Sequence, residues 1–366
     1  MKKIPVALFS VMLPFLVAAH PNKVVYRKTI HKDYQLKDKD LLHLGNKYGR
    51  IALHTWNKNE VQATIIVSGY GQDLHEAEQI ADLVNIDASQ AADQGDVSIS
   101  TSYNKPSAGL SSLWHLLFSG APDKTGSYVN IDYEVYVPAS LRMLDVENNY
   151  GDVTADTISC PFNLAMNYCR FDLDGISEPL TVRMDYSKGT ISHAVSINLS
   201  AKYSTLDNEE TGSISTRSDY SNYRLQKVGT FSLHSDYDEV QIDQLTDLSG
   251  ESDYTHYRIG KLDGSADLHM DYGDFKVGTL GKDFRKISVT STYGGVYLGI
   301  SPGTAFQLEA NLSYGNLKTG NIPFKNVISN TQGAKKSFSG LGDGANELSP
   351  LISFHGTYAD LVLKSP

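Results

Sequence analysis

Apolar and polar positions alternate along most of this chain in short blocks, and the blocks recur at a nearly constant interval. Apolar residues stand six and four positions before a tyrosine and again three and five positions after it, as Phe162, Leu164, Phe171 and Leu173 do around Tyr168. Alternation with a period of two is typical of β-strands and not of helices. The repeating unit therefore reads as a strand, a tight turn at the tyrosine, a second strand and a second turn.

Repeats of constant length are typical of stacked architectures, in which each unit buries its face against the next. We therefore predict an all-β protein, a parallel β-solenoid with coils of 17–18 residues and a small N-terminal β/α cap region. A row of antiparallel hairpins is the alternative. The tyrosines that mark the repeat are Tyr150, Tyr168, Tyr186, Tyr203, Tyr220, Tyr237, Tyr254 and Tyr272.

A small residue follows most of these tyrosines, for example Gly151, Ser187 and Gly273. Gly and Ser are predicted to supply the unusual backbone dihedrals that such a corner needs. The tyrosines share a phase with the apolar positions before them, so we expect a structural ladder at the corner whose hydroxyls reach backbone groups. The alternative is a platform of stacked aromatic rings for sugars, which bind through their apolar faces.

The region 20–140 departs from the repeat and is predicted to cap the solenoid, although one unit is already present around Tyr48. The spacing predicts strands over 61–67 and 131–137, a helix or further strands over 73–92, and a Gly-, Ser- and Pro-rich loop insertion over 104–127.

The repeat domain is predicted over residues 141–366. A loop insertion over 321–350 interrupts the array, and a closing coil that contains Ile352, Phe354 and Tyr358 follows it.

The first 19 residues are predicted to be a secretory signal peptide, because Lys2 and Lys3 precede an apolar run that ends in small residues. The run is too short, and too interrupted by proline, for a membrane-spanning helix. We expect an exported protein, periplasmic or on the cell surface, without a transmembrane segment after cleavage. Loss of the two lysines changes the formal charge from −10 to −12, which argues against nucleic acid as a partner.

Cys160 and Cys169 are the two cysteines of the chain. Export makes a disulfide between them possible, and two unpaired, partly buried thiols are the alternative. Their spacing, without a nearby His pattern, does not predict a metal site.

Several segments form an ordered set of motifs, namely Lys47-Tyr48-Gly49-Arg50-Ile51, Trp56, Tyr133-x-Val135-x-Val137-Pro138 and Asn149-Tyr150-Gly151-Asp152-Val153 with its repeats. This set resembles adhesin-like families of unknown function from Gram-negative cell envelopes. The resemblance spans most of the chain, from about Leu41 to Leu363, and it implies an exported β-solenoid with no established chemistry. The loops at 104–127 and 321–350 are longer than the pattern.

An acidic column directly precedes the tyrosines. Stacked carboxylates would repel one another or recruit a cation such as calcium. Aspartate also suits a turn, where it accepts backbone N–H bonds, and Asn149 and Asn167 occupy the same place. We favour the turn role and predict no metal and no cofactor. The column contains Asp185, Asp219, Asp236, Asp253 and Asp271.

Two further features are candidate binding sites. Arg224, Arg258 and Lys276 stand four residues after their tyrosines and form a basic stripe that could meet an acidic polysaccharide or simply face solvent. Trp114 and Phe118 belong to an apolar cluster inside the polar loop, which could be a docking tip or an anchor for the loop itself.

The chain has no Gly-x-Ser-x-Gly, no phosphate loop and no His-Glu-x-x-His motif. We therefore predict a non-enzymatic adhesin-like or envelope scaffold protein, with a surface glycan or an envelope protein as its partner. The alternatives are a carbohydrate-binding module and a polysaccharide-active β-helix enzyme.

Overall fold

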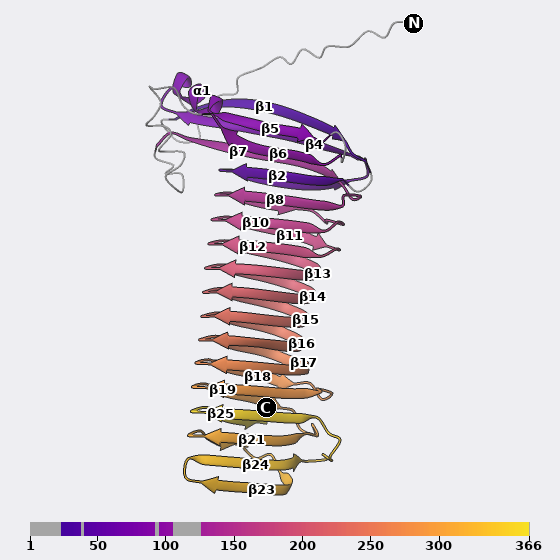
Figure 1. The fold of residues 1–366 in the computed structure, drawn as a ribbon, viewed down its shortest axis with the longest axis vertical. Coiled ribbons are helices and arrows are strands. Elements are labelled where there is room, and N and C mark those ends of the chain that lie inside the picture. The colour runs from indigo at the N-terminus through magenta and orange to yellow at the C-terminus, as the bar shows by residue number, and fades with distance from the viewer. Residues whose placement is uncertain (1–22, 38–39, 92–94, 105–125, 366) are drawn as a thin grey trace.

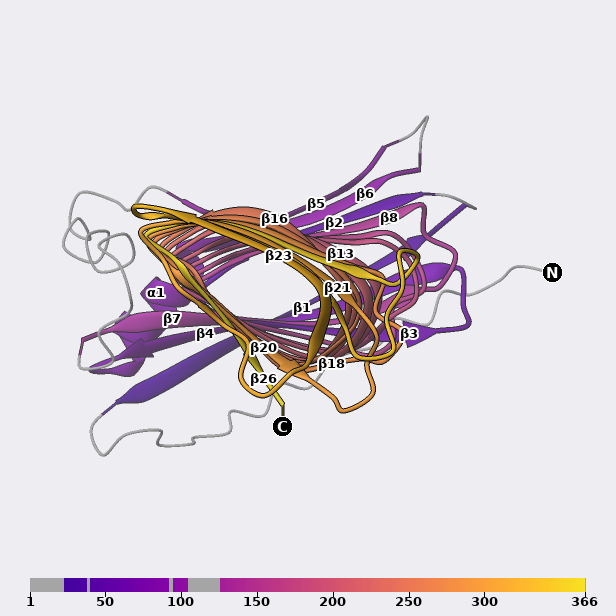
Figure 2. The same ribbon diagram turned by 90° about the horizontal axis from the view of Figure 1, so that it is seen from below.

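The computed structural model describes residues 23–37, 40–91, 95–104 and 126–365. The chain forms a rod of stacked coils with the N-terminal region at one end (Figure 1). Two sheets face each other across a narrow interior, which the view along the rod shows as a flattened ring (Figure 2). The all-β parallel solenoid with coils of about 18 residues is thus confirmed.

Sheet A holds the strands that precede the tyrosines. In each coil in the middle of the rod, one long strand begins in sheet B and ends in sheet A, so only its second half belongs to sheet A. In spatial order sheet A contains β5 (Val84–Gln90), β6 (Val97–Tyr103), β2 (Leu41–Lys47), β8 (Met143–Asn149), β10 (Phe162–Asn167), β12 (Leu180–Asp185), the second halves of β13 (Lys188–Lys202), β14 (Thr205–Asp219), β15 (Asn222–Asp236), β16 (Glu239–Asp253) and β17 (His256–Asp271), then β19 (Lys286–Thr292), β25 (Leu351–Thr357), β21 (Gln307–Ser313), β24 (Lys335–Gly342) and β23 (Phe324–Gln332).

Sheet B holds the strands that follow the tyrosines. In spatial order it contains β1 (Val24–Gln35), β4 (Glu60–Gly71), β7 (Tyr128–Pro138), β3 (Arg50–Trp56), β9 (Asp152–Ala155), β11 (Arg170–Ile176), the first halves of β13 to β17, β18 (Asp274–Leu280), β20 (Gly295–Ile300), β26 (Asp360–Lys364) and β22 (Leu317–Lys318).

The apolar side chains of the repeat fill the space between the two sheets. Ile197, Leu199 and Leu206 are each at most 2% exposed. Adjacent coils pair residue for residue, so that each inward position stacks on its equivalent in the next coil. The period-two pattern of the sequence therefore identifies the core correctly.

At the N-terminal end both sheets continue past the first coil, and a helix packs there mainly against β4 and β1. The helix α1 (Leu74–Asp82) buries Ala77, Ile80 and Ala81, and Asp73 caps it by accepting the N–H of Glu76 at 2.8 Å. The spacing of 73–92 allowed a helix or strands, and the structure contains both, because β5 follows α1 directly.

Strand β1 has no counterpart among the predicted elements. Its half-buried face carries Tyr26, Lys28, Ile30, Lys32 and Tyr34. Lysines at alternate positions bury their apolar stems against the sheet and keep their charge in water. These lysines interrupt the alternation of apolar and polar residues, so the strand cannot be recognised from that pattern.

Two expectations for the C-terminal end were wrong. The insertion 321–350 is not simply a loop, because β23 and β24 form an antiparallel hairpin whose Phe324 and Phe338 pack at 5.3 Å and close the core against Phe306. The coil of 351–364 does not close the rod either. Strand β25 inserts between β19 and β21 and pairs in parallel with both.

Candidate interaction surface

In each coil the corner that leads from sheet A to sheet B is made by a tyrosine in the left-handed backbone region. Twelve tyrosines, from Tyr48 to Tyr358, have φ between 49° and 67°. The prediction that Gly or Ser supplies this conformation was wrong, since the following residue has ordinary φ. At Gly151 glycine is needed for space instead, because a Cβ there would lie 1.9 Å from the carbonyl oxygen of Gly49.

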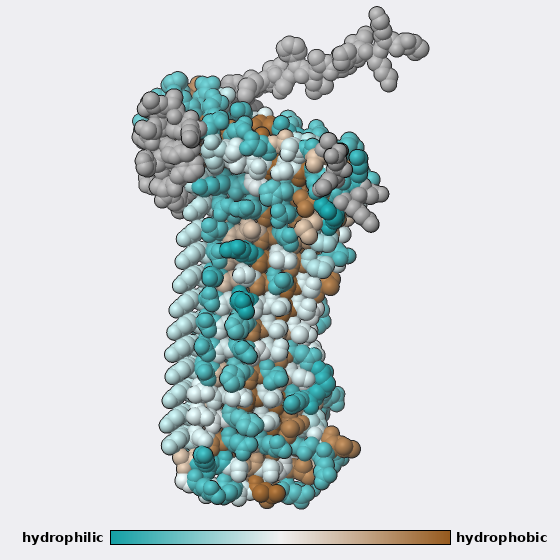
Figure 3. Space-filling view, in the orientation of Figure 1, coloured by the Kyte–Doolittle hydropathy of each residue, from teal (hydrophilic) through white to brown (hydrophobic). Residues whose placement is uncertain are grey.

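The tyrosine rings stack along one edge of the rod. From Tyr150 to Tyr314 neighbouring ring centroids are 4.6–5.2 Å apart, with interplanar angles of at most 8°. Figure 3 shows a regular row of side chains projecting from the edge where the strands of sheet A end. We call this row the tyrosine ladder. Its exposed members are Tyr168, Tyr186, Tyr203, Tyr220, Tyr237, Tyr254, Tyr272, Tyr293, Tyr358 and Tyr314, in spatial order.

The exposed rings are 42–65% accessible, so the expectation that they lie with the buried positions was wrong. The left-handed corner turns each ring outward. Among the described residues, the hydroxyls from Tyr168 to Tyr358 make no hydrogen bond with the backbone. Since each ring covers its neighbour's face, sugars cannot stack on the ladder except at Tyr314, the last ring, which is the most exposed.

A second, buried ladder runs inside the corner at the position after the tyrosine. The hydroxyls of Ser187, Ser204 and Ser221 each donate to the carbonyl two residues earlier and accept an N–H from the preceding coil at 3.0–3.3 Å. This ladder satisfies backbone groups that the sharp corner would otherwise leave unpaired. It performs the role that we had expected of the tyrosine hydroxyls.

Asp238 interrupts the inner ladder with a buried carboxyl group. It is 1% exposed, accepts the N–H of Ser221 at 2.7 Å and accepts a hydrogen bond from the Ser218 hydroxyl. Burial raises the pKa of Asp238 to about 6, and the negative charges of Asp219 and Asp236 add to the rise.

The acidic column lies beside the tyrosine ladder on sheet A. Asp219, Asp236, Asp253 and Asp271 are in register on consecutive coils. Lys202 pairs with Asp219 at 3.5 Å, and no other ion pair to these four carboxylates occurs within the described ranges. Neither this column nor any other group of His, Cys, Asp or Glu in the described chain forms a metal site.

Each cation of the basic stripe has a carboxylate partner. Arg224 donates to Asp207 at 2.6 Å, Arg258 to Glu239 at 3.1 Å and Lys276 to Asp274 at 2.9 Å. Burial alone would raise the pKa of Asp207, but the hydrogen bonds from Arg224 and Lys188 outweigh it and lower that pKa. The stripe therefore offers a polyanion little uncompensated positive charge.

The remaining candidates are placed as follows. Trp114 and Phe118 lie outside the described residues, as does most of the loop 104–127. Cys160 and Cys169 are buried free thiols, and burial raises the pKa of Cys160 to about 11. Cys169 belongs to the inner ladder, where its Sγ contacts the carbonyl of Asn167 at 3.1 Å.

A cluster around His54 is brought together by the fold alone. His54 contacts Glu134 at 2.6 Å and Asp156 at 2.9 Å, and its ring lies 5.0 Å from that of Tyr136. Burial lowers the pKa of His54, but hydrogen bonds to the two carboxylates outweigh this and raise it. His54 lies on β3, Glu134 and Tyr136 lie on β7, and Asp156 directly follows β9, so no spacing in the sequence marks them.

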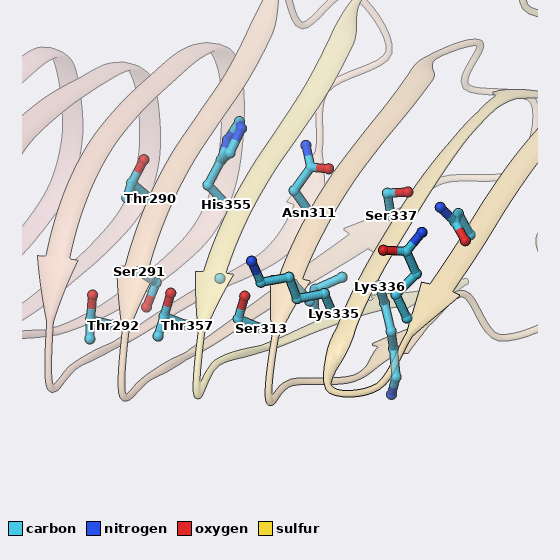
Figure 4. Close-up of a pocket in the computed structure, with 14 residues that line it drawn as sticks. Thr290, Ser291, Thr292, Asn311, Ser313, Lys335, Lys336, Ser337, His355 and Thr357 are labelled. Carbon is cyan, nitrogen blue, oxygen red and sulfur yellow. The ribbon is translucent and has the colours of Figure 1, made fainter.

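A polar hollow of about 400 Å³ opens on sheet A near the C-terminal end (Figure 4). Two rows of outward side chains line it across five strands. One row is Thr290, His355, Asn311, Ser337 and Asn330, and the other is Thr292, Thr357, Ser313, Lys335 and Gln332. We call this site the C-terminal hollow.

No protein-family model and no curated protein matches this chain. Among the described residues no helix is long and apolar enough to cross a membrane. Several solved structures are similar to this chain at low sequence identity.

A "putative adhesin" of Parabacteroides merdae is 10% identical, with a TM-score of 0.37, and the match covers 72% of this chain and 96% of that chain. A "putative adhesin" of Bacteroides fragilis is 11% identical, with a TM-score of 0.31 and coverage of 92% and 97%. A "putative cell adhesion protein" of Clostridium sporogenes is 9% identical, with a TM-score of 0.20 and coverage of 93% and 100%. Likenesses this distant show nothing about the function of this chain.

Proposed function

We propose that this protein is an exported, non-enzymatic interaction protein of adhesin type, and that the exposed tyrosine ladder is its contact edge. One observation carries the proposal. A residue other than glycine in the left-handed region costs about 1–2 kcal/mol, and Gly or Asn would fit each corner at lower cost. The chain nevertheless keeps tyrosine at all twelve corners, and ten of the rings project into solvent. Strain that is retained at an exposed site supports a role in binding.

The chemistry of the ladder favours a long partner. Its ring edges and hydroxyls recur every 4.6–5.0 Å from Tyr168 to Tyr314. A phenolic hydroxyl both donates and accepts hydrogen bonds, and the ring contributes apolar area at a low cost in conformational entropy. An extended envelope glycan or a strand of an envelope protein could contact many equivalent rungs at once. Export is supported by the leader-like first 19 residues.

A carbohydrate-binding module is the second candidate. The C-terminal hollow favours it, because amide and hydroxyl side chains line it and Tyr314, which directly follows the lining residue Ser313, has a ring neighbour on one side only. Sugar sites commonly combine polar groups of this kind with an aromatic surface.

The proposal is tested with purified residues 20–366 and isolated Gram-negative envelopes. Tyr220, Tyr237 and Tyr254 are changed together to Phe, which preserves the ring stack and removes only the hydroxyls. We expect the wild type to sediment with the envelopes and the Phe variant to sediment at least several-fold less, with an unchanged melting temperature. Equal sedimentation of both proteins would make the ladder purely structural, and no sedimentation of the wild type would refute the adhesin role.

The location is tested on intact cells that produce the full chain with its leader. Cleavage of the mature protein by an added protease places it on the outer surface. Cleavage only after the outer membrane is opened places it in the periplasm. Recovery of an unprocessed protein in the cytoplasm would refute export.

A further inference from the structure

The C-terminal hollow differs from the rest of sheet A in its charge. On the middle coils the row next to the ladder consists of Asp219, Asp236, Asp253 and Asp271. On the last coils the same row continues as Thr292, Thr357 and Ser313, and the hairpin adds Lys335 in register with Ser313. The replacement of carboxylates by hydroxyls and one ammonium coincides with the position of the hollow.

No carboxylate lines the hollow, whereas two lysines, Lys335 and Lys336, do. Figure 4 shows the Lys335 side chain extending across the strand of Ser313, so that its ammonium lies between the two polar rows. Lys335 has no salt bridge or side-chain hydrogen bond within the described part of the chain, whereas Lys336 donates to Gly315 and Asn316 at 3.1 and 2.9 Å. One ammonium is therefore held over the site without a partner.

The other lining groups suit a sugar ring. Asn311 and Asn330 offer amides that can donate and accept, and threonine and serine offer hydroxyls at the spacing of neighbouring strands. Tyr314 directly follows Ser313, is 65% exposed and stacks on a tyrosine ring on one side only. A volume of about 400 Å³ is within the usual range of small-ligand sites, which begins near 300 Å³.

We propose that the C-terminal hollow binds a carboxylated sugar residue of the uronic acid class. The sugar carboxylate accepts hydrogen bonds from the Lys335 ammonium, the ring hydroxyls bond to Asn311 and the neighbouring Thr and Ser side chains, and the apolar face of a sugar ring lies against Tyr314. This inference rests on the second candidate function above and deepens it, because it concerns the same hollow, not the tyrosine ladder, and names the chemical class of the ligand.

Non-specific electrostatic attraction by the protein surface does not account for binding of an acidic sugar. The chain carries a formal charge of −10, and the acidic column lies on the same sheet, so that the overall field repels a polyanion. The basic stripe is neutralised by its own carboxylates. Binding of an acidic sugar must therefore come from a local arrangement of groups.

The test measures binding of an oligogalacturonate trimer by calorimetry at moderate salt, with its methyl-esterified form as the uncharged probe. We expect the acid to bind, the ester to bind at least tenfold more weakly, and Lys335→Gln to weaken binding of the acid to a similar degree. Lys325→Gln, on the same hairpin but outside the hollow, is the matched control and should bind as the wild type does. Asn311→Ala should weaken both probes, because it removes a contact to the sugar and not to the charge.

Absence of oligogalacturonate binding to the wild type would overturn the proposal, as would equal losses for Lys335→Gln and Lys325→Gln. Each variant is also checked for an unchanged melting curve, so that a folding defect is not read as lost binding. The Phe variant of the ladder should bind the trimer normally. Failure of the envelope experiment and failure of this one are therefore distinguishable.

Discussion

The middle coils and the C-terminal coils share one backbone but present different surfaces. Both place a left-handed tyrosine at the corner, stack its ring at 4.6–5.0 Å and fill the interior with apolar side chains. The outward row beside the ladder carries carboxylates in the middle and hydroxyls with Lys335 at the end. The fold thus constrains the inward and corner positions, and the outward rows are free to specify what the rod binds.

The two regions also differ in the order in which the chain builds them. Each middle coil stacks on the coil that precedes it in sequence. The last coil of the chain instead inserts between two coils made earlier, so that β21 depends on β25 for its parallel partner. In a simple stack the end can fray without disturbing the interior. Here the last coil of the chain lies between two other coils, so we expect its deletion to destabilise the coils on both of its sides.

Deletion of residues 351–366 is expected to have the largest effect. It removes the buried side chains of Ile352, Phe354, Leu361 and Leu363, each worth about 1.5–3 kcal/mol, and separates β19 from β21. We expect the free energy of unfolding to fall by roughly 6–12 kcal/mol, or the C-terminal coils to lose protection from hydrogen exchange altogether.

Deletion of residues 365–366 alone is the control and should leave both measurements unchanged. If the long deletion melts within a degree or two of the wild type, the inserted coil contributes little. The last coils would then behave as an ordinary fraying end, and the contrast with the middle coils would disappear.

Replacing Tyr220, Tyr237 and Tyr254 together by Asn should have the next largest effect. Asn adopts the left-handed conformation readily, so the variant removes the rings without adding backbone strain. Four ring contacts are lost, at about 0.5–1.5 kcal/mol each, and we expect urea unfolding to show a loss of roughly 2–6 kcal/mol.

The matching triple change to Phe keeps the stack and should stay within about 1 kcal/mol of the wild type, because the hydroxyls face solvent. A stable Asn variant would show that the rings are dispensable for folding, which would strengthen the case for a binding role. An unstable Phe variant would mean that the hydroxyls stabilise the rod through contacts with ordered water.

The repeat itself was predictable because in-register stacking requires similar residues at equivalent positions of every coil, so the same pattern recurs many times in the sequence. The alternation around Tyr168 predicts the core, and the coil length predicts the solenoid. The exposure of the tyrosines could not be read from phase, since the left-handed residue reverses the side-chain direction at the corner. A sequence pattern assumes a continuous strand, and it fails at the one residue where the strand turns.

The ends of the rod were less predictable for a different reason. The place of β25 between β19 and β21 depends on pairing between segments that are not consecutive, and no local period records such a choice. The C-terminal hollow follows from that pairing, because it brings Thr290, His355 and Asn311 side by side. The sequence shows the polar residues of the hollow only as single residues on separate strands, and nothing in it indicates that they form one site for a sugar.

Asp238→Ser is expected to have the smallest effect and to show the clearest dependence on pH. Serine occupies the same place in the coils of Ser204 and Ser221, where it accepts the N–H that Asp238 accepts here. The folded state holds the Asp238 proton more tightly than the unfolded chain does, since burial raises its pKa from 3.8 to about 6. Its contribution to stability is therefore fully present below about pH 4 and is lost as the pH rises through about 6.

The loss amounts to about 3 kcal/mol at neutral pH, at about 1.4 kcal/mol for each unit of pKa. The serine variant lacks this loss, so we expect it to unfold at higher urea than the wild type at pH 7 and at equal or lower urea at pH 4. Asp267→Ser, an exposed change on the same sheet, should leave the pH profile as it is. If Asp238→Ser shifts stability equally at both pH values, the carboxyl is not titrating inside the corner. The middle coils would then differ from the C-terminal coils only on their outer surface.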